Sequence, residues 1–427
     1  MVRVSGVADL VVVGASLAGL RAVEAVRNDG FAGSVTLVGA EEHLPYDRPP
    51  LSKDHLAADE PADSTYRERE KLDEIGVELV LGAPATALDV EACRVTVGDR
   101  DLAYDGLVIA TGADARRLPA SLVAPDLAGV VTLRTRDDSA HLHQLLRRGH
   151  PRVTVIGAGF IGSEIAAVAR TRGLEVTIVE ALPVPLVRGV GERMGRALTG
   201  IHEREGTRVL TGVSVEEIRG NASVESVVLA DGTVIGTDVL VVGIGAAPNV
   251  GWLESSGLTI DDGVVADATL AAAPGVYVAG DVARWPNALF DDVLGATMRL
   301  EHWTAASEQG ARAARNAVDP ASAQAYTTVP YFWSDWYSHR IQFVGVARSG
   351  EGFPDVEIEV VLGEEDGPFV ALYRCGERLA GALTVDRPAE VMQYRRLLMK
   401  RASWDEALEK AEERRARLAK KAAAAAG

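Results

Sequence analysis

The chain has 427 residues, enough for about three domains of ordinary size. Its formal net charge of −17 argues against nucleic acid as a partner, because phosphate binding requires the opposite sign. No apolar run approaches the roughly 20 residues of a membrane-spanning helix. The N-terminus shows no signal peptide, so we expect a cytoplasmic protein without a membrane partner.

The first repeating unit begins with an aliphatic strand at 10–13, followed by a glycine turn and an alanine-rich stretch typical of a helix. Continuous rather than alternating apolar residues indicate a parallel strand that is covered on both faces. The turn reads Gly14-Ala15-Ser16-Leu17-Ala18-Gly19, a dinucleotide-binding fingerprint in which Ser16 replaces the usual middle glycine. After the next strand, either Glu41 or Glu42 is expected to bind ribose hydroxyls, and we favour Glu41.

A second unit of the same design begins with the aliphatic strand 153–156. Its turn reads Gly157-Ala158-Gly159-Phe160-Ile161-Gly162 and fits the fingerprint completely. The first glycine permits the tight turn, the second lets a pyrophosphate approach the backbone, and the third allows helix and strand to pack closely. The following strand, 176–180, ends in Glu180, whose carboxylate favours the ribose hydroxyls of NAD over the 2′-phosphate of NADP.

Each unit is followed by a further aliphatic strand that closes at a glycine, at 107–110 and 239–242. The run Val278-Ala279-Gly280-Asp281 has the same form, and its acid is placed to bind the polyol hydroxyls of a ribityl chain. Two dinucleotide sites in one chain indicate that one site holds a flavin and the other delivers a hydride to it.

The character of the sequence changes after about residue 326. Aromatic residues gather at 331–337, and alternating apolar stretches predict strands at 341–346, 356–362 and 369–373. From Ser403 the pattern predicts a helix that starts with a capping box to Glu406. We interpret this tail as a frayed surface helix.

The two cysteines, Cys93 and Cys375, form no CxxC pair, so neither a redox dithiol nor a cysteine-ligated metal is expected. We interpret both as inert buried thiols. No metal site is predicted elsewhere, because His141 and His143 lie two residues apart and point away from each other on a helix.

Taken together, the sequence resembles the two-dinucleotide-domain flavoprotein superfamily and, within it, the oxygenase-coupled ferredoxin reductases. The resemblance covers nearly the whole chain. Beyond the two glycine turns it is carried by the motifs Pro45-Tyr-Asp-Arg-Pro-Pro-Leu-Ser-Lys53, Leu133-Arg134-Thr135, Gly243-Ile-Gly245 with Pro248-Asn249, Glu301-His-Trp303 with Glu308-Gln309, and Phe332-Trp-Ser-Asp335.

This resemblance implies the residues that bind the two cofactors. FAD, held without a covalent bond, is expected at the first turn and at Glu41, Arg48, Lys53, Ala85, Arg134, Gly280, Asp281 and Trp303. NADH is expected at the second turn and at Ile161, Glu180, Arg188 and Gly245. Lys53 and Glu164 are expected to meet beside the flavin as the catalytic pair, where a fixed ammonium stabilises the negative charge of the reduced ring.

The predicted fold is therefore α/β, with two Rossmann-like dinucleotide-binding domains and a C-terminal α+β interface domain. By the resemblance, the FAD domain is split by the inserted NAD domain. The expected limits are 1–115 for the first part of the FAD domain, 116–246 for the NAD domain, 247–326 for the second part of the FAD domain, and 327–427 for the C-terminal domain with its helical tail.

The expected activity follows from the resemblance and from the missing thiols. Relatives that use one reactive cysteine carry it directly after a Leu-Ser pair, where this chain has Lys53. Electrons must then leave the flavin directly, which suits a one-electron iron–sulfur acceptor. The sequence predicts an NADH-dependent reductase that serves a [2Fe–2S] ferredoxin and, through it, an oxygenase of the haem monooxygenase or Rieske dioxygenase type.

Three alternatives stay open at this point: an NADH oxidase, a reductase of an organic radical, and an NADH-sensing flavoprotein of the apoptosis-inducing-factor type. The chain lacks the basic patches expected of the last, which we rank low. Monomer and weak dimer are both compatible with the sequence. Because ferredoxins are usually acidic, the docking face should be locally basic. Two clusters could supply it: Arg312 with Arg315, and Arg395, Arg396, Lys400 and Arg401. Each cluster taken singly is typical of an ordinary solvated helix face, and our hypothesis is that at least one rims the flavin edge.

Overall fold

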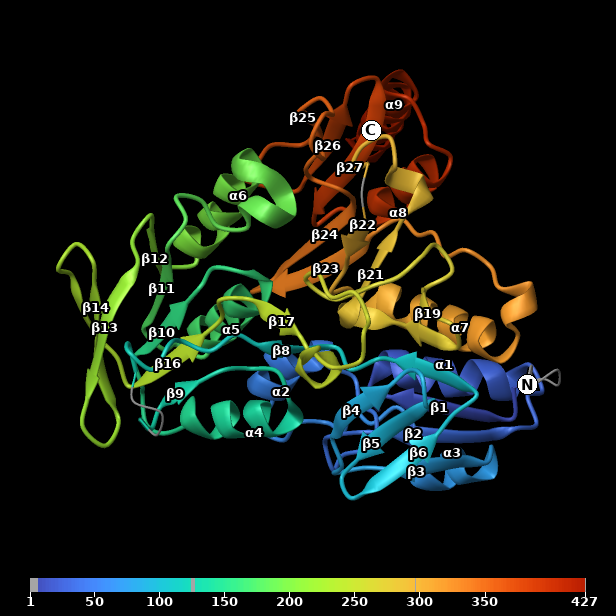
Figure 1. Ribbon diagram of the computed structural model, residues 1–427. Coiled ribbons are helices and arrows are strands. Elements are labelled where there is room, and N and C mark those ends of the chain that lie inside the picture. Colours follow the sequence, from blue (N-terminus) through green and yellow to red (C-terminus); the bar gives the residue numbers. More distant parts are fainter. Residues whose placement is uncertain (1–6, 124–126, 296, 427) are drawn as a thin grey trace.

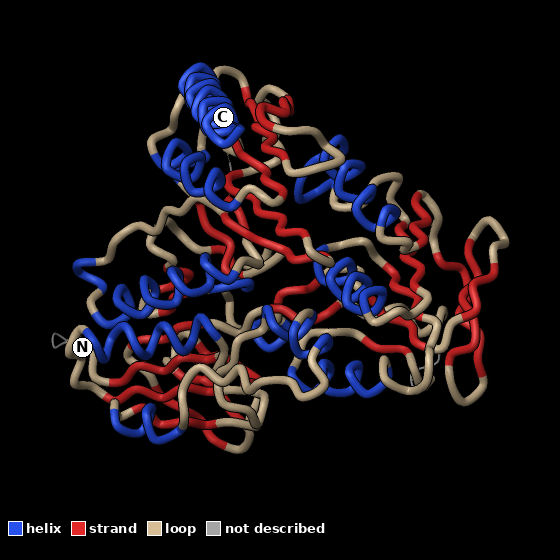
Figure 2. Tube along the Cα trace, turned by 180° about the vertical axis from the view of Figure 1, so that it is seen from behind, coloured by secondary structure: helices blue, strands red, loops and turns tan. Residues whose placement is uncertain are grey.

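The structure is a computed structural model that describes residues 7–123, 127–295 and 297–426. Two parallel sheets and one antiparallel sheet form three adjoining bodies (Figure 1). Figure 2 shows the same arrangement from behind, with the C-terminal helix packed outside the third sheet. The predicted fold class, two Rossmann-like domains plus a C-terminal α+β domain, is confirmed. The predicted outer limits at residues 1 and 427 lie outside the described residues.

The first sheet has the strand order β19-β20-β7-β1-β2-β3. All its neighbours pair in parallel except the edge strand β19. Strands from both ends of the 1–326 region therefore share one sheet. Their bounds are β1 Asp9–Val13, β2 Ser34–Val38, β3 Val77–Val80, β7 Gly106–Ile109, β19 Ala271–Ala273 and β20 Val276–Val278.

Helices α1 (Leu17–Asn28) and α7 (Trp303–Val318) pack against each other beside this sheet. They cross closely because Gly310 has no side chain: a Cβ there would lie 2.1 Å from the carbonyl oxygen of Ala18. A small antiparallel sheet packs on another face through the apolar cluster that includes Leu88, Val95 and Leu107. Its strands are β4 Ala85–Asp89, β5 Arg94–Val97 and β6 Arg100–Ala103.

The second parallel sheet has the order β12-β11-β10-β16-β9. Three of its strands, β10 Val153–Ile156, β11 Val176–Glu180 and β16 Val239–Val242, have the bounds predicted from sequence. Its other elements are β9 Val130–Val131, β12 Arg208–Thr211, α4 Arg136–Leu145, α5 Phe160–Thr171 and α6 Val187–Arg204, with an antiparallel sheet of β13 Val215–Gly220, β14 Val224–Leu229 and β15 Val234–Gly236.

The chain crosses between the two bodies along a short antiparallel pair, β8 (Ala113–Ala115) and β17 (Ala246–Pro248). Smaller elements fill the remaining connections. They are η1 Pro49–Ser52, α2 Asp54–Ala57, α3 Arg69–Glu74, η2 Gly251–Leu253, β18 Val264–Val265, η3 Gly280–Val282, β21 Ala283–Pro286, η4 Ala288–Phe290, β22 Thr297–Arg299 and η5 Pro320–Ser322.

The C-terminal sheet is antiparallel, with the order β23-β24-β27-β26-β25. Its strands are β23 Tyr331–Trp336, β24 His339–Gly345, β25 Val356–Leu362, β26 Phe369–Cys375 and β27 Arg378–Val385, followed by α8 Pro388–Met399 and α9 Trp404–Ala426. The predicted capping box is present, with backbone N–H groups and side chains of Ser403 and Glu406 bonded reciprocally.

Two expectations from the sequence are wrong. The tail is not simply a frayed surface helix, because Trp404, Ala407 and Ala411 bury the first turns of α9 against the sheet. Of the two thiols, Cys375 is buried, whereas Cys93 is exposed because it occupies the loop between β4 and β5. Within the described ranges, no helix combines the length and apolar character that crossing a bilayer requires.

Candidate active site

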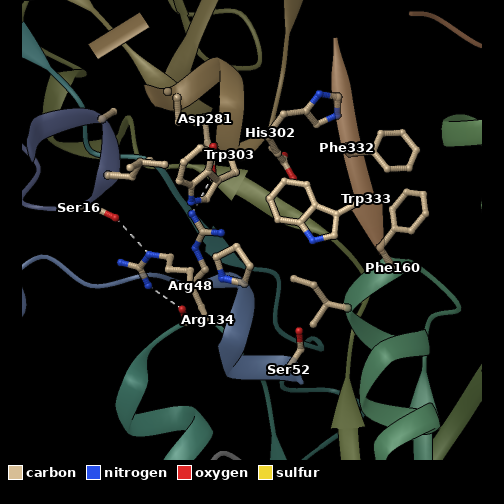
Figure 3. Close-up of a pocket in the computed structure, with 18 of the residues that line it drawn as sticks. Ser16, Arg48, Ser52, Arg134, Phe160, Asp281, His302, Trp303, Phe332 and Trp333 are labelled. Atoms are coloured by element: carbon tan, nitrogen blue, oxygen red, sulfur yellow. Dashed lines mark hydrogen bonds and ion pairs between the residues drawn. The ribbon is translucent and has the colours of Figure 1, made fainter. Parts of the chain in front are cut away.

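A cavity opens where the three bodies meet, and Figure 3 shows residues that line it. Its first compartment has a volume of about 400 Å³. Twelve predicted site residues line this compartment: Ser16, Leu17, Ala18, Arg48, Lys53, Arg134, Phe160, Ile161, Glu164, Gly280, Asp281 and Trp303. They come from α1, the η1 region, the segment before α4, α5, η3 and α7, so the fold brings together residues that are far apart in the sequence.

A second compartment, also about 400 Å³, adjoins the first and shares Ser16, Arg48 and Arg134 with it. Predicted residues Gly14, Glu41 and Ala85 line it. The two compartments therefore adjoin at the N-terminus of α1, which begins after Ser16. Exposed backbone N–H groups at that helix end favour a negatively charged group such as a phosphate.

Gly14 and Gly19 shape the first turn. Gly14 has a φ of +122°, and a Cβ there would lie 2.0 Å from the carbonyl oxygen of Ala110. A Cβ at Gly19 would lie 1.9 Å from the carbonyl oxygen of Gly14, so helix and turn touch through backbone. Ser16 begins the helix, and its hydroxyl accepts a hydrogen bond from Arg48 Nε at 3.3 Å.

The acid that follows β2 is fixed by two donors. Glu41 accepts hydrogen bonds of 2.6 Å from the hydroxyl of Tyr46 and from the guanidinium of Arg48. Burial raises the pKa of Tyr46, so its phenol stays protonated and can donate. Glu41 lines the second compartment, whereas Glu42 is exposed and lies outside the lining.

A partly buried ion pair lines the cavity. The guanidinium of Arg134 lies 2.8 Å from Asp281 Oδ2, and the carbonyl of Arg134 accepts from Arg48 at 2.6 Å. Gly280, which precedes the acid, donates its N–H to Gln309 of α7 at 2.8 Å. These bonds link the segments 48–53, 133–135 and 280–281 around one space, as Figure 3 shows.

A lysine and a glutamate also line the first compartment. Lys53 Nζ lies 2.8 Å from Glu164 Oε2, and both side chains are largely buried. The hydroxyl of Ser52 donates to the same carboxylate oxygen, and that of Ser334 donates to Oε1. The ammonium is therefore held by a carboxylate whose other contacts are all hydrogen-bond donors.

Aromatic side chains close the wall opposite α1. Phe160 and Phe332 have ring centroids 4.5 Å apart, and Trp303 meets Trp333 edge-on at 6.4 Å. The indole nitrogen of Trp303 donates to Asp47 Oδ1 at 2.8 Å, which fixes its plane. Trp333 also lines the cavity. Trp336, three residues on, is core instead, with 1% of its surface exposed.

The second glycine turn is built like the first. Gly157 has a φ of +97°, and a Cβ there would lie 2.3 Å from the carbonyl oxygen of Gly243. Gly162 has the same restriction, with the carbonyl oxygen of Gly157 at 2.3 Å. At Gly159 a Cβ would meet nothing nearer than 3.8 Å, so the backbone at the start of α5 is open to a ligand.

Glu180 stands beside this turn. Its carboxylate accepts N–H groups of Ala158 and Leu182, each at 2.9 Å. Phe160 and Ile161, on the first turn of α5, line the first compartment, so the second turn lies directly behind the cavity wall. Arg188 is exposed next to Gly189, which does line the cavity, and Gly245 has a φ of +101°. The predicted residues outside the lining of both compartments are Gly19, Gly157, Gly159, Gly162, Glu180, Arg188 and Gly245.

Neither basic cluster lines the cavity. Arg315 is paired with Asp29 at 2.6 Å, and Arg312 is bonded to Gln324. Arg312 and Arg315 lie roughly 14 and 18 Å, respectively, along α7 from Trp303, given a rise of about 1.5 Å per residue. In the second cluster, Arg395 is paired with Glu308, and Arg401 with Asp291 and Asp292. None of these residues lines either compartment, and the position of a basic docking face stays a prediction.

The cavity shows features of a site built for a dinucleotide. Its lining residues His302 and Trp252 each carry a buried ring nitrogen that has no hydrogen-bond partner among the described residues. Burial lowers the pKa of His302 to about 4, so this ring is neutral at neutral pH and can donate or accept. No group of three His, Cys, Asp or Glu side chains in the described part of the chain could hold a metal ion.

Several lining residues were not predicted from the sequence. Tyr46 and Ser52 line the first compartment and lie inside the 45–53 motif, but no role was assigned to them. Ser334, which is buried outside the lining and bonds to Glu164, lies inside the 332–335 motif and was likewise assigned no role. Trp252 follows the Pro248-Asn249 motif and lines the second compartment. For the motif residues, position within the motif was the available signal, because a lone hydroxyl has no recognisable spacing to its partner.

Comparison with known proteins agrees with this geometry. The sequence matches the family described as pyridine nucleotide-disulphide oxidoreductase over residues 8–310 and the family described as reductase C-terminal over residues 331–418. It is 33% identical over 403 residues to the ferredoxin–NAD(+) reductase component of the p-cumate 2,3-dioxygenase system of Pseudomonas putida, covering 93% of this chain and 95% of that protein. It is also 33% identical to human apoptosis-inducing factor 3, covering 92% of this chain and 64% of that protein.

Among solved structures, the chain is similar to that of the covalent putidaredoxin reductase–putidaredoxin complex. The TM-score is 0.85 at 30% identity, covering 92% of this chain and 93% of that one. Both glycine turns and the Lys53–Glu164 pair lie within the 8–310 match, and β23 begins the 331–418 match. The chain therefore belongs to the pyridine nucleotide-disulphide oxidoreductase family and is an oxidoreductase with the C-terminal domain of its reductase members.

Proposed function

We propose that this oxidoreductase binds FAD non-covalently, takes a hydride from NADH, and passes single electrons to a [2Fe–2S] ferredoxin that supplies an oxygenase. One observation carries the proposal. Two adjoining compartments meet at the N-terminus of α1, a helix end suited to a phosphate, and the Lys53–Glu164 pair lines one of them, with a second glycine turn directly behind its wall.

The two compartments support FAD rather than a mononucleotide. The first compartment has the aromatic and ionic lining that a flavin ring requires, and it ends at the helix terminus beside Ser16. The second continues past the turn to Glu41, Ala85 and Trp252. A mononucleotide would leave this second space unfilled, whereas an adenosine would place its ribose hydroxyls at the Glu41 carboxylate.

The second turn supports NADH as the hydride donor. The open backbone at Gly159 can receive the pyrophosphate, and the fixed carboxylate of Glu180 repels a 2′-phosphate. Ile161 is 44% exposed although it is apolar, and it lines the first compartment. An exposed apolar residue at this point gives the nicotinamide ring a surface on which to lie against the flavin space.

The residues around the flavin space act by electrostatics and exclusion of water. Lys53 presents a fixed positive charge to the cavity, and Glu164 keeps it in place. The aromatic wall of Phe160, Phe332 and Trp303 limits access of water. A bound flavin accepts the two electrons of a hydride together and can release them one at a time, which suits an iron–sulfur acceptor.

The lack of a thiol relay supports direct electron transfer to a partner. Within the described lining of both compartments there is no cysteine, and Cys93 lies in the loop between β4 and β5. The acceptor must therefore approach the cavity itself. Trp333, which is half-buried on the cavity wall beside the exposed Arg340, marks the side of closest approach.

The proposal is tested by NADH-driven reduction of cytochrome c, measured with and without a [2Fe–2S] ferredoxin, alongside oxygen consumption. We expect cytochrome c reduction to depend on ferredoxin and oxygen consumption to be slow. Fast oxygen consumption that ferredoxin does not divert would favour the NADH oxidase alternative. NADH-dependent dimerisation with neither activity would favour a sensor like apoptosis-inducing factor.

A further inference from the structure

Glu164 is the meeting point of the three bodies. Its side chain is buried on α5, with 3% of the residue surface exposed. From the first body it receives Lys53 and Ser52 on Oε2, and from the C-terminal sheet it receives Ser334 on Oε1 at 2.5 Å. A serine more than 150 residues away in the sequence thus bonds directly to the carboxylate that holds the cavity lysine.

The direction of the Ser334 bond is fixed by a tryptophan. The indole nitrogen of Trp336 donates to Ser334 Oγ at 2.8 Å, and an indole nitrogen can only donate. The hydroxyl hydrogen of Ser334 is therefore free to point at Glu164. Ser334 and Trp336 lie on the same face of β23 because strand side chains alternate, so the strand itself sets their spacing.

Trp336 is held in turn by the second body. Its ring stacks on His202 of α6 at a centroid distance of 4.6 Å and an interplanar angle of 27°. His202 Nδ1 lies 2.8 Å from the hydroxyl of Tyr337, the residue after Trp336. The chain of contacts His202, Trp336, Ser334, Glu164, Lys53 is buried or largely buried along its whole length.

We propose that Ser334, aimed by Trp336, is a positioning residue that sets the place of the Lys53 charge in the cavity through Glu164. The C-terminal domain then tunes the reduction potential of the flavin, in addition to any part in binding the electron acceptor. This inference rests on the proposed function, in that it requires a flavin in the cavity.

The physical reason is the demand of a buried carboxylate for donors. Without the Ser334 hydroxyl, Oε1 of Glu164 would be left without its donor in a site closed to water. The carboxylate would then turn or draw Lys53 further toward itself, away from the cavity. A reduced flavin carries negative charge, so withdrawal of the ammonium destabilises the reduced form and lowers its potential.

The matched variants are Ser334→Ala, Ser334→Thr and Ser163→Ala. Ser334→Thr keeps the hydroxyl and tests rescue. Ser163 precedes Glu164 on α5 and is 1% exposed, and its hydroxyl has no hydrogen-bond partner in the described structure. Ser163→Ala therefore removes an equally buried hydroxyl beside Glu164 without removing a bond to it.

The measurement is the midpoint potential of the bound flavin in each purified holoenzyme, with kcat and KM for NADH recorded separately. We expect Ser334→Ala to shift the ratio of reduced to oxidised flavin about tenfold toward oxidised, which is about 30 mV for a two-electron couple. Its kcat should fall with little change in KM. Ser334→Thr should return the potential most of the way to that of the unmodified protein, and Ser163→Ala should match the unmodified protein.

An unchanged potential in flavin-loaded Ser334→Ala would overturn the inference, as would an equal shift in Ser163→Ala. If Ser334→Ala does not fold, Trp336→Phe replaces it, because that change keeps the serine and releases its orientation. Trp336→Phe should also lower the midpoint potential of the flavin, and an unchanged potential would again overturn the inference. Unmodified protein that binds no flavin would contradict the proposed function instead.

Discussion

Alanine in place of Gly14 or Gly157 should separate the two nucleotide sites. Each Cβ would meet a backbone carbonyl oxygen, at 2.0 Å for Gly14 and 2.3 Å for Gly157. Backbone cannot rotate aside as a side chain can, so each turn must move by roughly 1 Å to reach an ordinary contact. We expect Gly14→Ala to lose FAD and Gly157→Ala to lose NADH.

The magnitude combines strain with lost phosphate contacts. A side chain at positive φ costs about 1–2 kcal/mol, which affects stability in any such position. Displacing the turn also breaks hydrogen bonds to a charged phosphate, at about 1.5–3 kcal/mol each. Loss of two such bonds weakens binding roughly 100-fold or more.

The assay is the ratio of flavin to protein absorbance, followed by NADH titration. Gly14→Ala should purify with at most about a tenth of the flavin, as expected for this loss of affinity. Gly157→Ala should keep its flavin and show the weakened affinity for NADH. Gly30→Ala and Gly173→Ala are the matched controls, because both glycines have positive φ, at +85° and +82°, but nothing lies within 4 Å of a Cβ there. A fully flavinated Gly14→Ala, or normal NADH binding in Gly157→Ala, would refute the assignment of the turns.

Three further predictions concern charge. Burial lowers the pKa of His202 to about 4, below its unfolded value of about 6.5, so its contribution to stability is present above pH 6.5 and is lost as pH falls toward 4. Between pH 7 and 5 this amounts to about 2 kcal/mol, and denaturant unfolding of His202→Gln should lack that part of the pH dependence. Glu180→Gln should raise the NADPH-to-NADH ratio of kcat/KM about tenfold, because a like charge near the 2′-phosphate is removed; an unchanged ratio would mean that Glu180 does not face the ribose. Arg340→Glu, beside Trp333, should raise KM for ferredoxin several-fold at low salt and less at high salt, while dye reduction stays constant. The control Arg315→Glu should change neither KM for ferredoxin nor dye reduction. Equal effects of the two substitutions on KM would contradict the proposed side of approach.

The parallel strands could be predicted because burial on both faces leaves a continuous aliphatic run. Val153–Ile156, Val176–Glu180 and Val239–Val242 have the predicted bounds for this reason. The packing of the C-terminal tail was harder to predict. Its charges are mixed, and only the structure shows that Trp404 and Ala407 pack against the C-terminal sheet.

The site could be predicted where a motif forces a backbone shape, and not where long-range contacts decide it. Gly14 and Gly157 follow from the turn alone, because a Cβ does not fit there. The contact of Lys53 with Glu164 came from the family resemblance, since no local pattern links residues so far apart. The Ser334 bond was missed because a hydroxyl shows its direction only once the indole of Trp336 is in place beside it.

The central claim is that electrons pass from NADH to the flavin and from the flavin directly to a ferredoxin. Anaerobic titration of the yellow protein with NADH, followed by oxidised [2Fe–2S] ferredoxin, tests both steps in one cuvette. The account predicts that NADH bleaches the flavin and that ferredoxin restores its colour while becoming reduced. Flavin that NADH does not bleach, or that stays bleached when ferredoxin is added, would contradict it.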